Sequence, residues 1–194
     1  MALETITYLY HQFTNINTIF HGIIGDLRPE ELLARPAPRQ NMIGYTVWHI
    51  PRTQDAHVHT WIRGVPEVAH HERWRHLPDH ERYGYGVAIS LDEADEIARG
   101  VRLPDIMDYA DDVHNRIALW LKDLGPNDLD QVPDVADHLA KHAEYQVPGF
   151  LREVGHLLDQ SNWNQLMRPC IGHIHRHLGE LEITVAVIRS GGSI

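Results

Sequence analysis

Toward its C-terminal side the chain reads Gly172-His173-Ile174-His175-Arg176-His177-Leu178-Gly179-Glu180, inside a longer run that covers residues 161–190. Large aliphatic residues recur through this run at the three- and four-residue spacing of a helix that packs against other helices. These residues are Met167, Ile171, Ile174, Leu178, Leu181, Val185 and Ile188. The pattern therefore predicts an amphipathic helix with one apolar stripe.

Two histidines accompany this stripe. His173 and His177 fall one turn apart on one flank of it, and Glu180 continues the same row, whereas His175 falls on the opposite flank. Two imidazoles at i and i+4 can both reach one metal ion. With 16 histidines in 194 residues, however, such a pair also arises by chance. A solvated row of histidines beside a core face is the alternative, and a third ligand is needed to favour the metal.

Composition limits the classes of protein to be considered. A chain of 194 residues is long enough for one domain with a real core, and we expect a single domain over 1–194. The formal net charge of −10 argues against a surface that follows nucleic-acid phosphates. One cysteine excludes an intramolecular disulfide, and we find neither a signal peptide nor an apolar run of membrane-span length. We therefore expect a cytoplasmic protein with no nucleic-acid or membrane partner.

The rest of the chain also reads as helical. Apolar residues recur with a period near 3.6 in several segments, and no stretch alternates convincingly as a strand does. The predicted helical segments are 3–26, 43–62, 90–100, 103–124, 136–145, 150–158 and the run 161–190. Four of them are long and amphipathic, which indicates an all-α bundle with extra short helices in the connections.

The segment 43–62 carries the third candidate ligand, His49. Metal sites in helix bundles are built from side chains that project inward from facing helices, so His49 can meet the pair on the last helix. Pro51 complicates this prediction. Either the helix begins near Trp48 with Pro51 in its first turn, or Pro51 lies inside the helix and bends it beside His49. His57 and His59 fall on other faces and are interpreted as surface or structural residues.

The remaining candidates have less specific patterns. The histidines between residues 70 and 80 could bind a metal, but we interpret them mainly as facing solvent. Cys170, one turn before His173, could approach a metal, although a lone cysteine on an apolar stripe is more often core. Trp48 and Trp61 are interpreted as packing residues, and Tyr83 and Tyr85 as possible lining of a pocket mouth.

In the order of its motifs the chain resembles the DinB-like superfamily. That superfamily includes bacillithiol and mycothiol S-transferases and mycothiol-dependent maleylpyruvate isomerases. The resemblance rests on Val47-Trp48-His49-Ile50 after a proline-containing link and on His173-x-x-x-His177-Leu178-Gly179-Glu180 in the last helix. It covers essentially the whole chain in architecture. The chain departs from the family pattern at Pro51 and in the extra helical material at 136–158.

The resemblance implies a four-helix bundle, often dimeric, with a divalent metal such as zinc or nickel on three histidines near one end. Carried over, His49 matches the first ligand, His173 the second and His177 the third. Glu180 matches a polar position after the glycine, and we interpret it as a group that orients a ligand or handles a proton. Asp55 is a weaker candidate for this role.

A metal on three neutral imidazoles keeps an open position, where a thiol or a water molecule can be activated. The sequence thus predicts a metal-dependent transferase or isomerase that uses a low-molecular-weight thiol such as mycothiol or bacillithiol, acts on a small electrophile and forms a homodimer. The alternative is a non-catalytic bundle that binds a metal or a small ligand. Metal-independent hydrolysis by a His/Glu pair is the weakest hypothesis, because no nucleophile has an evident base partner.

Overall fold

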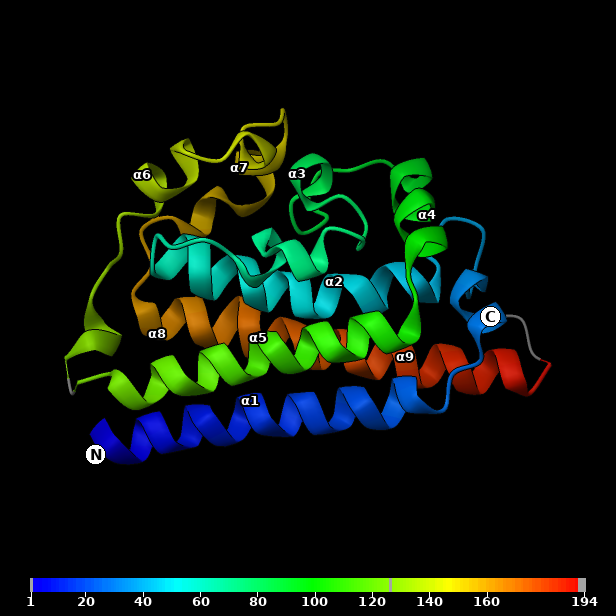
Figure 1. Ribbon diagram of the computed structural model, residues 1–194, viewed down its shortest axis with the longest axis horizontal. Helices are drawn as coiled ribbons and strands as arrows, with labels where there is room; N and C mark the ends of the chain where they lie inside the picture. Colours follow the sequence, from blue (N-terminus) through cyan, green and yellow to red (C-terminus); the bar gives the residue numbers. More distant parts are fainter. Residues whose placement is uncertain (1, 126, 192–194) are drawn as a thin grey trace.

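The computed structural model describes residues 2–125 and 127–191, and every regular element within them is a helix. Four long helical segments lie side by side (Figure 1). They are α1 (Ala2–Gly25), α2 (Ile43–Asp55) with its extension, α5 (Leu103–Asp123), and a composite of α8 (Asn162–Gln165) and α9 (His173–Arg189). The predicted all-α class is confirmed. In the part of the chain that the structure describes, no helix is both long and apolar enough to cross a bilayer.

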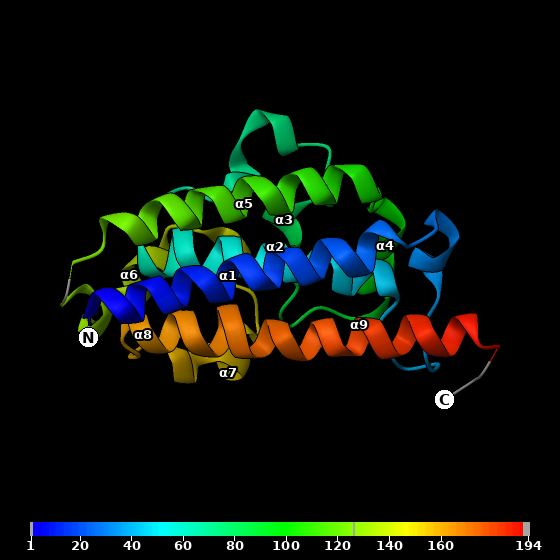
Figure 2. The ribbon, with the colours of Figure 1, turned by 90° about the horizontal axis from the view of Figure 1, so that it is seen from below.

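The long segments pack around a common core. α1 lies between α5 and α9, as Figure 2 shows, and α2 contacts the same two helices on the other side. The chain runs in one direction along α1 and α9 and in the opposite direction along α2 and α5, as the colours of Figure 1 show. α2 and α9, which carry the predicted ligands, are therefore neighbours.

Short helices fill the connections, as the sequence predicts. The α-helices among them are α3 (His80–Tyr83), α4 (Leu91–Gly100), α6 (Val135–Ala140) and α7 (Phe150–Val154). Short 3₁₀ segments cover Pro29–Leu33, Val68–His70, Glu72–Trp74, Asp128–Asp130, Ala143–Tyr145 and Gly155–Leu157. α4 begins at the predicted capping box, in which Ser90 accepts from the Glu93 N–H and the Glu93 carboxylate accepts from the Ser90 N–H.

Two stretches of the long segments are wound as π-helix. Ala56–Ile62 extends α2, and Leu166–Gly172 joins α8 to α9 directly before His173. π-helical turns are rare and are found frequently at functional sites. Pro51 lies inside α2, so the helix begins several residues before Trp48. The interpretation that places Pro51 within the helix beside His49 is therefore the one that the structure supports.

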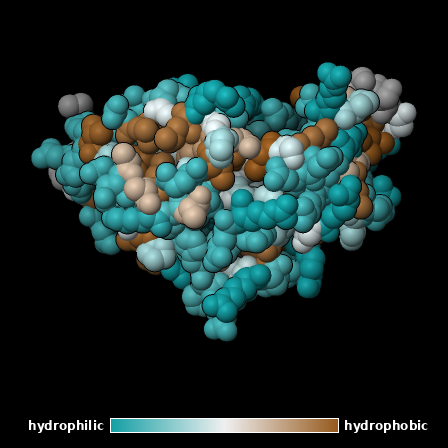
Figure 3. Space-filling view, turned by 90° about the horizontal axis from the view of Figure 1, so that it is seen from above, coloured by the Kyte–Doolittle hydropathy of each residue, from teal (hydrophilic) through white to brown (hydrophobic). Residues whose placement is uncertain are grey.

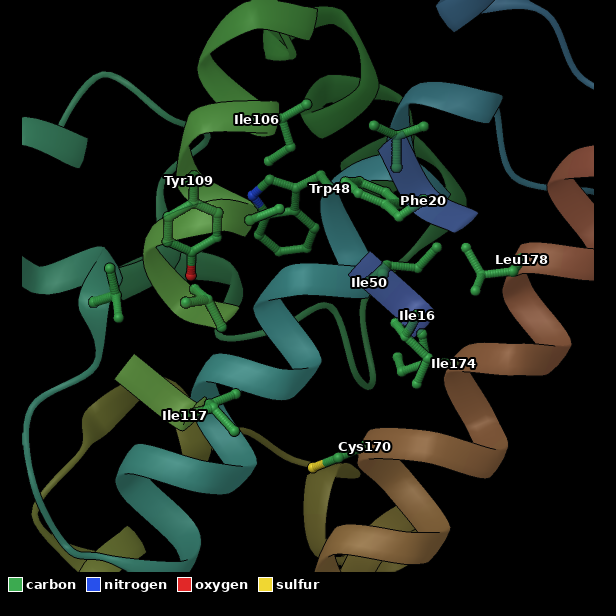
Figure 4. Packing of buried hydrophobic residues seen from close by; sticks show 14 of the residues in the cluster. Ile16, Phe20, Trp48, Ile50, Ile106, Tyr109, Ile117, Cys170, Ile174 and Leu178 are labelled. Carbon is green, nitrogen blue, oxygen red and sulfur yellow. The ribbon is translucent and has the colours of Figure 1, made fainter. Parts of the chain in front are cut away.

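The predicted stripe of the last helix packs into the core. Ile174 and Leu178 are buried and lie near Ile16 of α1 and Ile50 of α2 in Figure 4. Met167, Val185 and Ile188 are only partly buried at the ends of the stripe. Because one face of the last helix is fixed in this way, His173 and His177 are held at the edge of the core.

A buried network of charged and hydroxyl groups links α2 to the segment that follows it, which includes Glu67 and Gly84. Arg52 is 1% exposed, and its guanidinium contacts Asp55 at 3.1 Å and Glu67 at 2.6 Å. The same guanidinium donates to the carbonyl oxygen of Gly84 at 3.0 Å, and Tyr145 donates to Glu67. Buried charges require such partners, and removal of one partner is strongly destabilising. The network therefore fixes the backbone next to Tyr85 against α2.

Candidate metal centre

α2 and α9 bring the three predicted ligands together. His49 projects from the middle of α2, whereas His173 and His177 occupy the first two turns of α9. The Nε2 atom of His173 lies 3.3 Å from Nε2 of His49 and 3.0 Å from Nε2 of His177. We call these three residues the tri-histidine centre. The prediction that His49 meets the pair across the helices is thus confirmed in geometry.

The distances from Nε2 of His173 to the other two Nε2 atoms fit one metal ion. Zinc–nitrogen bonds of about 2.0–2.1 Å in a tetrahedral site place neighbouring ligand nitrogens roughly 3.3 Å apart. The observed distances of 3.0 and 3.3 Å lie close to that value. Imidazole suits zinc, nickel, copper and iron alike, so the donor set does not select among these metals.

Hydrogen bonds on the far side of two rings direct Nε2 toward the centre. Nδ1–H of His49 donates to the carbonyl oxygen of Tyr85 at 2.5 Å, and Nδ1–H of His177 donates to Oε2 of Glu180 at 2.6 Å. We assign these tautomers from the hydrogen-bond partners, since only Nδ1–H can donate to an oxygen that carries no hydrogen. Nε2 of His49 and Nε2 of His177 therefore carry the lone pair of their rings. Such outer partners fix the orientation of metal-ligating histidines and increase their basicity.

His173 has a different partner. A guanidinium nitrogen of Arg176 donates to its Nδ1 at 3.0 Å, so the ring hydrogen of His173 is on Nε2 and points to the neighbouring rings. An ion at Nε2 requires the other tautomer, with the hydrogen on Nδ1, and the guanidinium must then leave. Because the Arg176 side chain is 64% exposed, it can move at little cost. The contact between Arg176 and His173 should therefore weaken metal binding only slightly.

Burial keeps the three imidazoles neutral. Burial, reinforced by His177 and His173, lowers the pKa of His49 to about 3. Burial, together with His173 and Arg176, lowers the pKa of His177 to about 3 as well, and burial followed by Arg176 lowers the pKa of His173. Neutral imidazole is the form that binds a metal. The rings are therefore ready to act as ligands at neutral pH.

A second group of side chains could also hold an ion. His70, His142 and Glu144 offer ligand atoms within 4.8 Å of one another, and we call them the loop cluster. Nδ1 of His142 lies 3.2 Å from Glu144, and Nε2 of His70 lies 3.8 Å from it. However, the backbone N–H of Glu67 donates to Nδ1 of His70, which leaves the ring hydrogen on the nitrogen that faces Glu144. Because a backbone N–H cannot swing away, the loop cluster is less suited to a metal.

A large cavity opens beside the tri-histidine centre. Its volume is about 630 Å³, and His49, Thr53 and His173 line it together with apolar residues of the α7 region. Figure 3 looks onto the face that carries α7, and hydrophobic residues lie along one long edge of that face. Ligand pockets typically measure roughly 300–1,000 Å³ and are mostly apolar with a few polar groups. The cavity therefore has room for a small organic molecule next to two histidines of the tri-histidine centre.

His177 and Glu180 line a different, smaller cavity. Its volume is about 320 Å³, and Thr46 of α2 and Thr184 of α9 also contribute to it. The tri-histidine centre thus has a cavity on each of two sides. Glu180 is 54% exposed there, so its carboxylate is open to solvent while it holds the His177 ring.

Several predictions about other residues need correction. His57 and His59 are 1% and 2% exposed, so of the two alternatives, surface or structural, the surface one was wrong. His59 contacts Asp55 in the buried network, and His57 lines the larger cavity. The carboxylate of Asp55 contacts Arg52, His59, Tyr109 and two backbone N–H groups, and none of these contacts involves the tri-histidine centre. Asp55 is therefore part of the buried network rather than a partner of His49.

Other predictions are confirmed. Cys170 is fully buried, and burial raises the pKa of its thiol well above its usual range, as expected for a core cysteine. Trp48 and Trp61 are also fully buried. Tyr85 lines the larger cavity, as predicted, but it is 3% exposed and lies deep rather than at the mouth.

The histidines of the predicted solvent-facing loop divide into two groups. His71 and His76 are exposed, as predicted, whereas His80 is buried and His70 is half-buried. Sequence reasoning also missed the role of the Tyr85 carbonyl, because a backbone oxygen leaves no signal in a single sequence.

Comparisons with known proteins add no assignment. No protein-family model matches this chain, and no curated protein matches it. Any statement about function consequently rests on the geometry of the site.

Proposed function

We propose that this chain is a metal-dependent enzyme of the DinB-like superfamily and that its four long helical segments form the four-helix bundle of that family. The tri-histidine centre would hold one divalent ion, with zinc or nickel as the expected metals. The observation that carries the proposal is the convergence of three Nε2 atoms, 3.0 and 3.3 Å apart, from two helices that are distant in sequence.

The proposed activity is the transfer or isomerisation of a small electrophile with the help of a low-molecular-weight thiol or water. A divalent ion on three neutral imidazoles supplies an open ligand position that lowers the pKa of a thiol or of water there. The larger cavity, which borders both His49 and His173, is where we place the organic substrate. Mycothiol and bacillithiol are the thiols that the resemblance suggests.

The residues of the chain would act by binding, orienting and excluding water. The Tyr85 carbonyl and the Glu180 carboxylate hold two ligand rings in the tautomer that presents Nε2. Glu180 would also take or return a proton at the smaller cavity, since its carboxylate is half exposed and adjacent to a ligand. Tyr45, which stacks on His49 with ring centroids 5.5 Å apart, shields that ring from solvent.

The direct test is an activity assay with and without metal. Protein loaded with zinc or nickel is expected to consume a thiol in the presence of a small electrophile. Chelation should abolish the reaction, and re-addition of the metal should restore it. Loss of activity in His173→Ala with an unchanged helical circular dichroism spectrum would support the assignment.

Two outcomes would change the proposal. Stoichiometric metal without turnover of any thiol and electrophile pair would favour a non-catalytic binding protein. A wild type that contains no metal after growth in metal-replete medium would contradict the metal-dependent function itself. The expected homodimer is tested separately, by light scattering on the purified protein.

A further inference from the structure

The larger cavity contains a cation that has no partner. Arg168 lines this cavity, is exposed, and makes neither an ion pair nor a side-chain hydrogen bond within the described residues. The chain has 27 acidic residues against 17 lysines and arginines, so partners for an arginine are abundant. Glu153 is the one carboxylate among the described residues that line the cavity, and it forms no ion pair with Arg168.

The same cavity is also lined by a buried histidine, His57. His57 is 1% exposed, and its side chain has Gln165 as a polar neighbour. Its ring is fixed by Trp61 and Tyr85, with ring centroids 4.4 and 5.2 Å away. Because its Nδ1 atom is closed off from solvent, His57 forms a fixed part of the cavity wall.

The helix geometry links the free cation to the tri-histidine centre. Arg168 precedes His173 by five residues, a separation of at most about 7.5 Å along the helix axis. Gly172 lies between them and also lines the cavity. Val154 and Leu157 supply apolar walls on the opposite side.

We propose that Arg168 binds an oxyanion group of the substrate, a carboxylate or a phosphate, whose apolar body lies between α7 and the π-helical stretch before α9. The far end of such a molecule reaches His49 and His173. The substrate class is therefore a small organic acid or organic phosphate with an apolar portion. This inference rests on the proposed function for what happens at the metal, but the binding of the anion does not require the metal.

The test measures binding to protein from which metal has been removed with a chelator. Phenylacetate, phenyl phosphate and the neutral analogue phenylacetamide are titrated into the wild type by isothermal calorimetry. We expect at least one of the two anions to bind about 10-fold more tightly than the amide, because charge-assisted hydrogen bonds to arginine are stronger than neutral ones. The anion that binds more tightly identifies the carboxylate or the phosphate as the preferred group.

Two variants make the result specific to Arg168. Arg168→Gln should abolish the preference for the anion and leave amide binding unchanged. Arg152→Gln, an exposed arginine of α7 outside the cavity lining, should keep the full preference. Equal binding of anions and amide by the wild type, or an undiminished preference in Arg168→Gln, would overturn the proposal. Because the ion is absent throughout, these outcomes are independent of whether the metal-dependent activity exists.

Discussion

The tri-histidine centre and the loop cluster each bring three ligand atoms together, yet they differ in which nitrogens are already engaged. In the tri-histidine centre, two rings donate Nδ1–H to oxygen acceptors and keep Nε2 free. In the loop cluster, a backbone N–H occupies Nδ1 of His70, so the nitrogen that faces Glu144 carries the hydrogen. Distances between ligand atoms alone do not separate the two groups, whereas the outer hydrogen bonds do.

The electrostatic surroundings differ in the same sense. Burial lowers the pKa of His49 and His177 to about 3, and the group of possible ligands formed there by the described residues consists of three histidines. In the loop cluster, the Glu144 side chain raises the pKa of His70, and Glu144 already serves as the acceptor of His142. The first group consists of neutral imidazoles whose Nε2 atoms converge, and only His173 must change its tautomer to bind an ion. In the second group, the histidines and the carboxylate already serve as partners of one another.

The largest expected effect is the loss of metal affinity in His173→Ala. Removal of one of three ligands should weaken binding of zinc at least about 100-fold, beyond the 10- to 100-fold typical of outer-shell partners. The matched control is His142→Ala in the loop cluster, which should bind zinc as the wild type does. Competition with a chromophoric chelator measures both affinities. Weakened zinc binding in His142→Ala, with unchanged binding in His173→Ala, would mean that the loop cluster is the zinc site.

The outer hydrogen bond of His177 should have a smaller effect. Glu180→Ala removes the acceptor of Nδ1–H, so the ring loses its fixed orientation and part of its basicity. We expect zinc affinity to fall about 10- to 100-fold. Glu182→Ala, an exposed carboxylate of the same helix, serves as the control and should leave affinity unchanged. An unchanged affinity in Glu180→Ala would mean that the 2.6 Å contact has no role in metal binding.

The two regions should respond to pH with opposite signs. Burial lowers the pKa of His57, beside the tri-histidine centre, to about 3, so the folded state resists its protonation. The free energy of unfolding contributed by this group is present above pH 6.5 and is lost as the pH falls toward 3, by up to about 1.4 kcal/mol per pH unit. The pKa of His70 is raised by Glu144, so its contribution is present at low pH and is lost as the pH rises through that pKa.

Urea unfolding of metal-free variants between pH 5 and 8 checks these signs. Acidification should destabilise the wild type, because His57 binds a proton more readily in the unfolded state than in the folded state. The His57→Gln variant lacks this group, so its destabilisation relative to the wild type should become smaller as the pH falls. The destabilisation by His70→Gln should instead grow on acidification. The same pH trend in both variants would contradict the electrostatic difference between the two regions.

The smallest expected effect is a gain. Arg176→Met removes the guanidinium that donates to Nδ1 of His173, and the tautomer with a free Nε2 then forms at less cost. We expect zinc affinity to rise a few-fold, less than the roughly 10-fold that corresponds to about 1.4 kcal/mol. Arg152→Met is a suitable control because that arginine is exposed on α7 and lies outside the cavity lining. A decrease in affinity would mean that Arg176 assists His173 rather than competing with the metal.

Much of the fold could be predicted because hydrophobic periodicity specifies helices directly. The stripe that includes Ile174 and Leu178 placed His173 and His177 on one flank, and packing of that stripe then fixed their position. Ser90 and Glu93 marked the start of α4 because a capping box has a fixed spacing. The π-helical stretches could not be predicted, since an extra residue per turn leaves the apolar pattern nearly intact over a single turn.

The meeting of the three histidines could be predicted, but their surroundings could not. His49 was inferred from the rule that bundle sites form between facing helices and from a family resemblance. The engagement of its Nδ1 depends on the Tyr85 carbonyl, whose position is set by Arg52 through Gly84. These contacts are made between segments that are distant in sequence, and hydrophobic periodicity does not show which distant segments contact one another. The burial of His57 was missed for the same reason, because the segment that covers it is irregular in sequence.

The most direct test of the account is the metal content of purified wild type, His49→Ala and His142→Ala, measured by elemental analysis after growth in metal-replete medium. The account predicts about one ion per chain in the wild type and in His142→Ala, and almost none in His49→Ala, because His49 completes the site from another helix. Metal retained in His49→Ala but lost in His142→Ala would contradict the account and assign the ion to the loop cluster.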